Sequence, residues 1–352
     1  MLKLTWRGSG IGGLALAGCL LAGDAAFNPA DAQGAKPCAA MRKINIGVSV
    51  APPNVVHTSP YVAKELGIFA KYCVDANIIQ FDGGSSPAAK AAAAQGTALV
   101  SVTDIAVGAG VKVQQIWGLA PRMPQAYMVA ENIKTAADLK GKKLSAVGGG
   151  VGGFNWLMGR EVLKSANLKV EDANFIASAT AARLPGLVSG QIDAVALHPE
   201  DVYLAQQQKP GLHVLVQLAD MLPNYMFNAY GASTDWINRE RDLMVDTVAA
   251  MIEANRTIYR DEAKVVPIIM KATGKPKEAV EFARKVLIEN CIWSVNEGFN
   301  TERTQWTINN NVENGYVEAA KKPTVEQVSN VKLASDAVAK AGGRVTIGKC
   351  TE

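Results

Sequence analysis

The chain has 352 residues, of which 49% are hydrophobic and 19% charged, and its formal net charge is +4. This length and hydrophobic content are enough to bury a large core and favour about two domains. The basic residues are spread along the sequence and form no run interleaved with aromatic residues, so we expect no nucleic-acid partner. After the N-terminus, no apolar stretch is long enough to cross a bilayer.

Residues 1–32 have the pattern of a signal peptide. A segment with positive charge and a short apolar segment, residues 11–23, precede a small-x-small cleavage pattern at Ala30–Ala32. An alternative is that Leu16–Cys19 acts as the lipobox of a bacterial lipoprotein, with a lipid anchor on Cys19. Either pattern predicts a protein that leaves the cytoplasm, and we expect it in the periplasm.

Export changes how the cysteines are interpreted. Cleavage after Ala32 leaves four of them, and an even number in an oxidising compartment favours disulfides over the alternative of free buried thiols. Of the three possible pairings we favour Cys38–Cys73, because each lies just before a predicted strand and adjacent parallel strands bring those starts together. Cys291–Cys350 is then the second disulfide. No Cys/His spacing indicates a metal site.

Strands alternate with helices from residue 44 onward. We predict strands at 44–50, 74–81 and 98–103, with helices at 61–69 and 88–95 between them. This order implies a parallel sheet with right-handed crossovers, in which ligands bind at the carboxyl ends of the strands. The loops at those ends carry Asn54, His57, Thr58, Gly83, Ser85, Thr103 and Asp104.

A second set with the same alternation follows an extended segment at residues 127–130. Its predicted strands are at 143–147, 174–177 and 194–197, and a strand-like run at 226–232 ends it. Two extended crossings, one out and one back, predict two α/β lobes joined by a two-strand hinge. Predicted helices at 241–259, 263–272, 277–289, 301–318 and 325–341 complete the first lobe. We assign lobe I to residues 36–130 and 233–352, and lobe II to residues 131–232.

A glycine-rich loop at residues 148–153 joins a predicted strand to a helix that begins near Phe154. Glycines in this position leave unpaired backbone N–H groups at the positive end of a helix, which suits the anionic or polar end of a ligand. The loop also matches the G-x-G-x-x-G dinucleotide fingerprint. Glu171 and Asp172 precede the next strand instead of ending it, so we do not expect a dinucleotide. A tight packing turn is the simpler alternative.

Two histidines, His57 and His198, lie just after predicted strands. A neutral histidine can donate and accept at once, which suits a heterocycle or a carboxylate, whereas a structural histidine is the simpler alternative. Glu200 lies close to His198, but no serine or cysteine is placed as a nucleophile, so we expect neither hydrolysis nor a cofactor. Asp104 is suited to capping the next helix as well as to binding a ligand cation.

Several of these segments resemble a known family. Asn54-x-x-His57, followed by Tyr61-Val62-Ala63-Lys64-Glu65-x-Gly67-x-Phe69, resembles the first loop and helix of ABC-importer substrate-binding proteins. The branch is the one for alkanesulfonates, taurine, nitrate and thiamine- or riboflavin-related heterocycles. Residues 138–143 and 187–194 resemble its entry to the second lobe and a later strand.

The resemblance implies a type II periplasmic binding protein fold, in which two α/β lobes close on a ligand like a hinge. It implies a monomeric, non-enzymatic protein whose partners are a small-molecule ligand and an ABC permease with its ATPase. The implied ligand-binding residues are Ser49, Asn54, His57, Thr58, Thr103 and Asp104 in lobe I and Gly149, Gly150, Gly152, Asn155, His198 and Glu200 in lobe II.

Two departures from the family pattern leave the ligand open among heterocycles, aromatic acids and sulfonates. The glycine-rich loop lacks the serine that the family often uses, and no aromatic residue precedes Pro53. Alternatives are a pyrimidine-synthase-like enzyme on the same fold and a ligand-sensing module for a membrane receptor.

Overall fold

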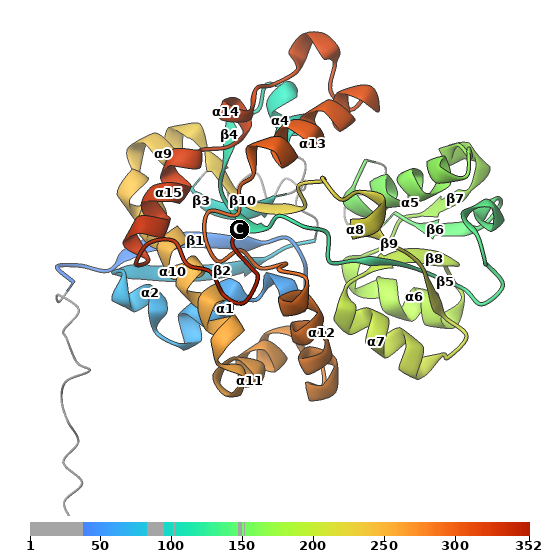
Figure 1. The fold of residues 1–352 in the computed structure, drawn as a ribbon, viewed down its shortest axis with the longest axis horizontal. Helices are drawn as coiled ribbons and strands as arrows, with labels where there is room; N and C mark the ends of the chain where they lie inside the picture. The colour runs from blue at the N-terminus through green and yellow to red at the C-terminus, as the bar shows by residue number, and fades with distance from the viewer. Residues whose placement is uncertain (1–37, 83–94, 101–102, 147–149, 151) are drawn as a thin grey trace, which may run out of the picture. The chain divides into compact units, whose positions relative to one another are not determined.

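The computed structural model describes residues 38–82, 95–100, 103–146, 150 and 152–352. The predicted signal peptide, Cys19, Gly83, Ser85, Gly149 and nearly all of the predicted helix at 88–95 lie outside these residues. Within the described chain, the strands form two sheets, and helices pack around each of them (Figure 1). We call the elements around the first sheet the first lobe and those around the second sheet the second lobe.

The first sheet has the strand order β2-β1-β3-β10-β4. Its strands are β1 (Arg42–Val48), β2 (Val74–Gln80), β3 (Gly96–Val100), β4 (Val113–Ala120) and β10 (Asn228–Ser233). β1 pairs in parallel with β2 and β3, as the alternation of strands and helices predicts, whereas β10 is antiparallel to β3 and β4. The antiparallel strand is the one that returns from the second sheet, so the sheet is mixed rather than all-parallel.

The second sheet has the strand order β7-β6-β8-β5-β9. Its strands are β5 (Ala126–Val129), β6 (Lys143–Ser145), β7 (Asn174–Ile176), β8 (Ala194–Leu197) and β9 (His213–Gln217). β6 pairs in parallel with β7 and β8, and β5 is antiparallel to β8 and β9. Every residue of β5 and β8 is buried, which fits two strands inside a sheet that is covered on both faces.

Helices of the first lobe pack on its sheet and on one another, with α10 contacting α1, α2, α11 and α15 (Figure 1). They are α1 (Ser59–Glu65), α2 (Ile68–Lys71), α4 (Thr103–Gly108), α9 (Thr234–Arg239), α10 (Arg241–Arg260), α11 (Glu262–Thr273), α12 (Lys277–Glu289), α13 (Thr301–Glu313), α14 (Val325–Val328) and α15 (Val331–Lys340). The 3-10 turns η2 (Val55–His57) and η6 (Ala319–Lys321) also belong here.

The second lobe has α5 (Phe154–Ser165), α6 (Arg183–Ser189), α7 (Pro199–Gln208) and α8 (Leu218–Met221). The 3-10 turns are η3 (Ala136–Leu139), η4 (Val170–Asp172) and η5 (Thr180–Ala182). α5 contacts β6 and β8, and α6 contacts β8 and α7.

The lobe boundaries expected from the sequence differ from the strand assignments by a few residues. β5, which the predicted boundary places in lobe I, pairs with β8 and β9 of the second sheet, and most of β10, placed in lobe II, pairs with β3 and β4 of the first. The strands themselves are therefore not shared by the two sheets. The chain passes between the sheets at residues 121–125 and again at residues 218–227 (Figure 1).

Both predicted cysteine pairs occur in the structure. The sulfur atoms of Cys38 and Cys73 are 2.03 Å apart, and those of Cys291 and Cys350 are 2.04 Å apart. The first pair joins the starts of β1 and β2, and the second ties the end of the chain to the segment after α12.

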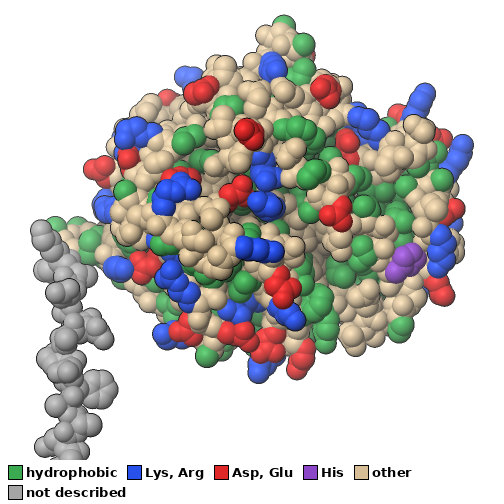
Figure 2. Space-filling view, viewed as in Figure 1, with side chains coloured by type: hydrophobic (Ala, Val, Ile, Leu, Met, Phe, Trp, Pro, Cys, Tyr) green, Lys and Arg blue, Asp and Glu red, His purple; other side chains and the backbone are tan. Residues whose placement is uncertain are grey.

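The surface visible in Figure 2 carries lysine, arginine and acidic side chains scattered among one another. This distribution agrees with the spread of charge along the sequence. No helix in the described part of the chain combines the length and hydropathy needed for a bilayer span.

Candidate functional site

His57 and His198 meet where the two lobes touch. His57 ends η2, in the loop that follows β1, and His198 is the residue immediately before α7, directly after β8. Their ring centroids are 5.3 Å apart with an interplanar angle of 73°, and both side chains are buried. The carboxyl ends of two strands in different sheets thus bring together two histidines that are far apart in sequence.

Each histidine ring contacts one amide side chain. Asn228 Nδ2 lies 3.0 Å from His57 Nε2, and Gln125 Nε2 lies 3.2 Å from His198 Nε2. Burial, together with the positive charge of Arg183, lowers the pKa of His57 to about 3. Burial is also the main cause that holds the pKa of His198 well below its ordinary value. Both rings are therefore neutral at physiological pH.

Aromatic rings line the same junction. The Phe227 ring stacks near His57, with centroids 6.5 Å apart, and is tilted against His198 at 6.1 Å. Phe154, the first residue of α5, meets Phe227 edge-on at 5.3 Å. Phe227 comes from the second crossing segment, so this segment contributes an apolar wall to the site.

A buried polar network joins the lobes beside the histidines. Asn54 Nδ2 donates to Glu200 Oε1 at 2.7 Å, and the backbone N–H of Val55 donates to the same oxygen at 3.0 Å. Arg183 Nη2 donates to Asn54 Oδ1 at 2.9 Å and lies 4.0 Å from Asp201. Lys275, between α11 and α12, forms an ion pair with Asp201.

Glu200 is the least exposed member of this network. Burial raises the pKa of its carboxyl, and the neighbouring carboxylate of Asp201 raises it further. Hydrogen bonds from Asn54 and from backbone N–H groups act in the opposite direction, because they favour the charged form. One oxygen of Glu200 thus accepts two hydrogen bonds, and the other is buried without a partner among the described residues.

Several other buried polar atoms around the junction share this property. An unpaired buried polar group costs about 1–3 kcal/mol, so a cluster of them indicates that something outside the described residues completes the site. Four such atoms belong to residues of the junction, namely His57 Nδ1, His198 Nδ1, Gln125 Oε1 and Glu200 Oε2. Elsewhere in the described chain, buried atoms without a partner include Asn155 Oδ1, Thr103 Oγ1, Thr180 Oγ1 and the hydroxyl groups of Tyr225 and Tyr230.

Three further predicted site residues, Ser49, Thr58 and Asp104, belong to the first lobe. Ser49 follows β1 and is half-buried, and the Thr58 hydroxyl donates to Val55 O at 2.8 Å, which closes the η2 turn. Asp104 lies in the first turn of α4 and accepts from Asn311 of α13 at 2.7 Å. Burial raises the pKa of the Asp104 carboxyl.

The glycine-rich loop is described only in part. Gly150 and Gly152 have φ angles of +66° and +84°, a region that favours glycine. The N–H of Gly150 donates to Ala146 O at 3.1 Å, so this amide, expected from the sequence to be free for a ligand, is used by the loop. Asn155 in the first turn of α5 is buried.

Six residues of the junction were not expected from the sequence: Gln125, Arg183, Asp201, Phe227, Asn228 and Lys275. Of these six, only Asp201 could have been found from the sequence, because it is adjacent to the predicted site residue Glu200. Gln125, Phe227 and Asn228 lie in or next to the crossing segments, where no strand-end pattern marks them. Arg183 and Lys275 reach the site from helix ends, and nothing in their local sequence separates them from surface cations.

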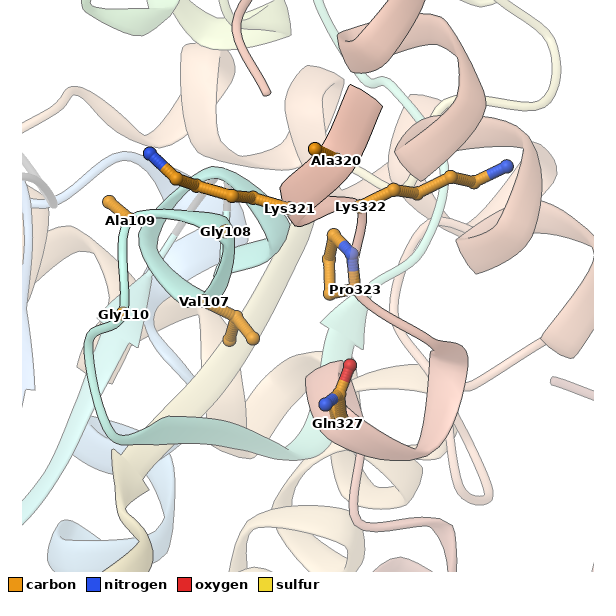
Figure 3. Close-up of a pocket in the computed structure, with 9 residues that line it drawn as sticks. All are labelled: Val107, Gly108, Ala109, Gly110, Ala320, Lys321, Lys322, Pro323 and Gln327. Atoms are coloured by element: carbon orange, nitrogen blue, oxygen red, sulfur yellow. The ribbon is translucent and has the colours of Figure 1, made fainter. Parts of the chain in front are cut away.

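Two cavities lie apart from the predicted site residues. One, of about 480 Å³, is lined by residues 107–110 at the end of α4 and by 320–323 and 327; Lys321 and Lys322 extend in opposite directions beside it (Figure 3). The other, of about 380 Å³, is lined by residues 134–136, 162, 165, 215, 216, 220 and 221 of the second lobe. No group of three or more histidine, cysteine or acidic side chains in the described chain is arranged to hold a metal ion.

Comparison with solved structures identifies the class of fold. The periplasmic aliphatic sulphonate binding protein SsuA from Escherichia coli is 20% identical, with a TM-score of 0.63 over 83% of this chain and 99% of that one. The periplasmic nitrate-binding protein NrtA from Synechocystis PCC 6803 is 14% identical, with a TM-score of 0.68 over 86% and 89%. The fold is that of periplasmic binding proteins, as predicted.

The desulfurization enzyme DszB has the same fold at greater distance, with 14% identity and a TM-score of 0.54 over 85% of this chain and 99% of that one. No curated protein matches the sequence. The NMT1/THI5-like family model matches residues 54–263, and the chain belongs to that family.

Proposed function

We propose that this protein is an exported solute-binding protein that captures a small organic ligand between its two lobes and delivers it to an ABC importer. The observation that carries the proposal is the set of buried, unpartnered polar atoms at the junction, His57 Nδ1, His198 Nδ1, Gln125 Oε1 and Glu200 Oε2, which come from both lobes. Ligand sites combine apolar walls with a few convergent polar groups, and Phe154 and Phe227 supply the wall here.

Both lobes contribute binding residues to this site. Asn54, His57 and Thr103 come from the first lobe, and Asn155, His198 and Glu200 from the second. The chain crosses between the sheets twice, which supports a hinge in residues 121–124 and 222–227. Closure of the lobes would bury the ligand, and opening at the permease would release it.

Among heterocycles, aromatic acids and sulfonates, the described residues favour a planar, weakly charged ligand. Two neutral imidazoles and two phenyl rings suit a flat molecule. Two cations, Arg183 and Lys275, lower the pKa of His198. Both already have partners, because Arg183 donates to Asn54 and Lys275 forms an ion pair with Asp201. The charge of a sulfonate would therefore need balance from elsewhere in the site.

A thermal-shift panel tests the proposal with MOPS, nitrate, benzoate, 4-aminopyrimidine and riboflavin as probes. A ligand that binds only the folded state raises the unfolding temperature by mass action. We expect one of the planar probes to do so, and His57→Leu to remove the shift while the far-UV spectrum is unchanged. Absence of a shift with all five probes would count against solute binding. Recovery of the bound probe unchanged after incubation separates transport from the enzyme alternative.

We also propose a periplasmic monomer, with residues 1–32 as the signal peptide or Cys19 as a lipid anchor. The mass of protein recovered from a periplasmic extract distinguishes cleavage from lipidation, and light scattering gives its oligomeric state.

A further inference from the structure

The two segments that join the sheets each end at an amide side chain that contacts a histidine. Gln125 directly precedes β5, and Asn228 begins β10. Each of them places its amide nitrogen on the Nε2 atom of a ring, Gln125 on His198 at 3.2 Å and Asn228 on His57 at 3.0 Å. All four side chains are buried. The same arrangement therefore occurs twice, once in each lobe.

An amide NH₂ group only donates, so a ring nitrogen that it meets accepts the hydrogen bond. A ring nitrogen that accepts carries no proton, and a neutral imidazole then has its single proton on Nδ1. In both His57 and His198 this Nδ1 atom is buried and has no partner within the described chain. Each ring is left with one N–H donor that the described residues do not use.

We propose that Asn228 and Gln125 are positioning residues, which fix His57 and His198 as Nδ1–H tautomers and so present two N–H donors to the ligand. The inference rests on the proposed function, because it requires a ligand at this junction. Two imidazole donors select for an acceptor on the ligand, such as a carbonyl oxygen, a ring nitrogen or an oxyanion. The two rings lie directly beside each other, with centroids 5.3 Å apart.

Each amide–histidine pair lies within a single lobe. His57 and Asn228 belong to the first lobe, and His198 and Gln125 to the second. The tautomers are thus set before the lobes meet, and each lobe offers its donor already oriented. Such preorganisation reduces the free-energy cost of ordering the site when the ligand binds.

Nitrogen-15 NMR of the imidazole rings tests this inference on the full, ligand-free chain. The sequence has only three histidines, and His213 is the internal reference. We expect His57 and His198 to show a protonated Nδ1 and an unprotonated Nε2 near neutral pH. A protonated Nε2 in both rings would overturn the proposal without any variant being made.

Two isosteric variants test whether the amide side chains set the histidine tautomers. Asn228→Asp and Gln125→Glu replace a donor by a carboxylate that accepts, so each should protonate Nε2 of its own histidine and leave the other ring unchanged. Asn290→Asp is the matched control, since Asn290 is exposed and its amide bonds Val286 O. Variants that fold and keep the wild-type tautomers would contradict the positioning role.

The measurement separates this inference from the proposed function, because no ligand is added. A protein that binds none of the probes still reports its tautomers, and that result would weaken only the proposal of solute binding.

Discussion

Asn54 donates to Glu200 over 2.7 Å, although the two residues follow strands of different sheets. Arg183 donates to the other end of the same amide at 2.9 Å, and Lys275 pairs with Asp201 beside Glu200. Two carboxylates, two cations and one amide form a buried chain in which formal charges balance. A charge buried in such a chain is stable only while its partner is present.

The first prediction follows from that balance. Lys275→Met removes one cation and leaves Asp201 with the Asn54 amide at 3.4 Å and Arg183 at 4.0 Å, so the folded state should lose about 1–3 kcal/mol. This loss is no larger than the lower end of the roughly 3–5 kcal/mol that breaking a fully buried ion pair costs, because the Lys275 side chain is 20% exposed. Urea unfolding at neutral pH measures the loss.

Lys277→Met is the matched control for this variant. Lys277 pairs with Glu281 within α12 at 3.4 Å, and its side chain is 62% exposed. Exposed pairs of this kind contribute about 0.3–0.5 kcal/mol, so the control should be close to wild type. Equal losses in the two variants would show that the buried network does not contribute more than a surface pair.

The second prediction concerns the pH dependence of stability. The pKa of His57 is about 3 in the folded state, against 6.5 for an ordinary histidine, because the ring is buried. Below pH 6.5 this histidine is protonated in the unfolded chain but stays neutral in the folded chain. The free energy of unfolding therefore decreases as the pH falls from about 6.5 toward 3. Each such histidine adds about 1.4 kcal/mol per pH unit to the slope.

His57→Gln removes one titrating group from this window. The free energy of unfolding of the variant should therefore fall less steeply with acid than that of the wild type, with His198 still contributing in the same direction. Glu200 acts with the opposite sign, because its raised pKa means that its burial penalty is relieved as the pH falls. Identical slopes for variant and wild type between pH 6.5 and pH 5 would contradict a neutral, buried His57.

Much of the architecture was predictable because it depends on local pattern. The apolar run at 194–197 is β8, buried along its whole length, and the helix predicted at 277–289 is α12 with the same bounds. His57 and His198 each follow a strand, as the sequence indicated, since the strand ends of an α/β lobe face the ligand edge.

Other elements were missed or misjudged for physical reasons. β4 and β9 were not predicted: polar Gln114 and Gln115 and the break at Gly118 interrupt the apolar pattern of β4. The helix predicted at 325–341 is divided, because Asn330 accepts from the N–H of Leu333 and so begins a new helix, α15. α13 ends at Glu313 rather than 318, and Gly315 follows at a φ of +74°.

Contacts across the junction depend on tertiary packing and had no local signal. Lys275 meets Asp201 across 74 positions of sequence, and Arg183 meets Asn54 across 129. Only the relative placement of the two lobes makes these side chains neighbours.

The third prediction is that Phe227 supports both the fold and the site. Phe227→Ala should cost about 3–5 kcal/mol, because the ring is buried and packs near His57, His198 and Phe154. Phe227→Leu refills most of the volume and should recover stability but not the flat wall, so probe binding stays weak. Phe282→Ala is the control, with a side chain that is 39% exposed. Full binding in a folded Phe227→Leu variant would exclude a stacking role.

The fourth prediction concerns the contact between Gly118 of β4 and Gly298. A Cβ atom on Gly118 would lie 1.9 Å from the carbonyl oxygen of Gly298, and the N–H of Gly118 donates to Glu297 O at 3.1 Å. Two backbones therefore touch, and no rotamer change relieves the clash. Gly118→Ala should destabilise the first lobe by about 3 kcal/mol or more, the upper end of the cost of overpacking a core.

Gly186→Ala provides the comparison, because an added Cβ there would make only ordinary contacts with Ile192 at 3.4 and 3.5 Å. Alanine is the better helix former by about 1 kcal/mol, so this variant of α6 should be neutral or slightly more stable. The measurement is the urea midpoint of both variants against wild type. β4 leads directly into the first crossing segment. If Gly118→Ala is as stable as wild type, the contact between Gly118 and Gly298 does not fix the position of this strand.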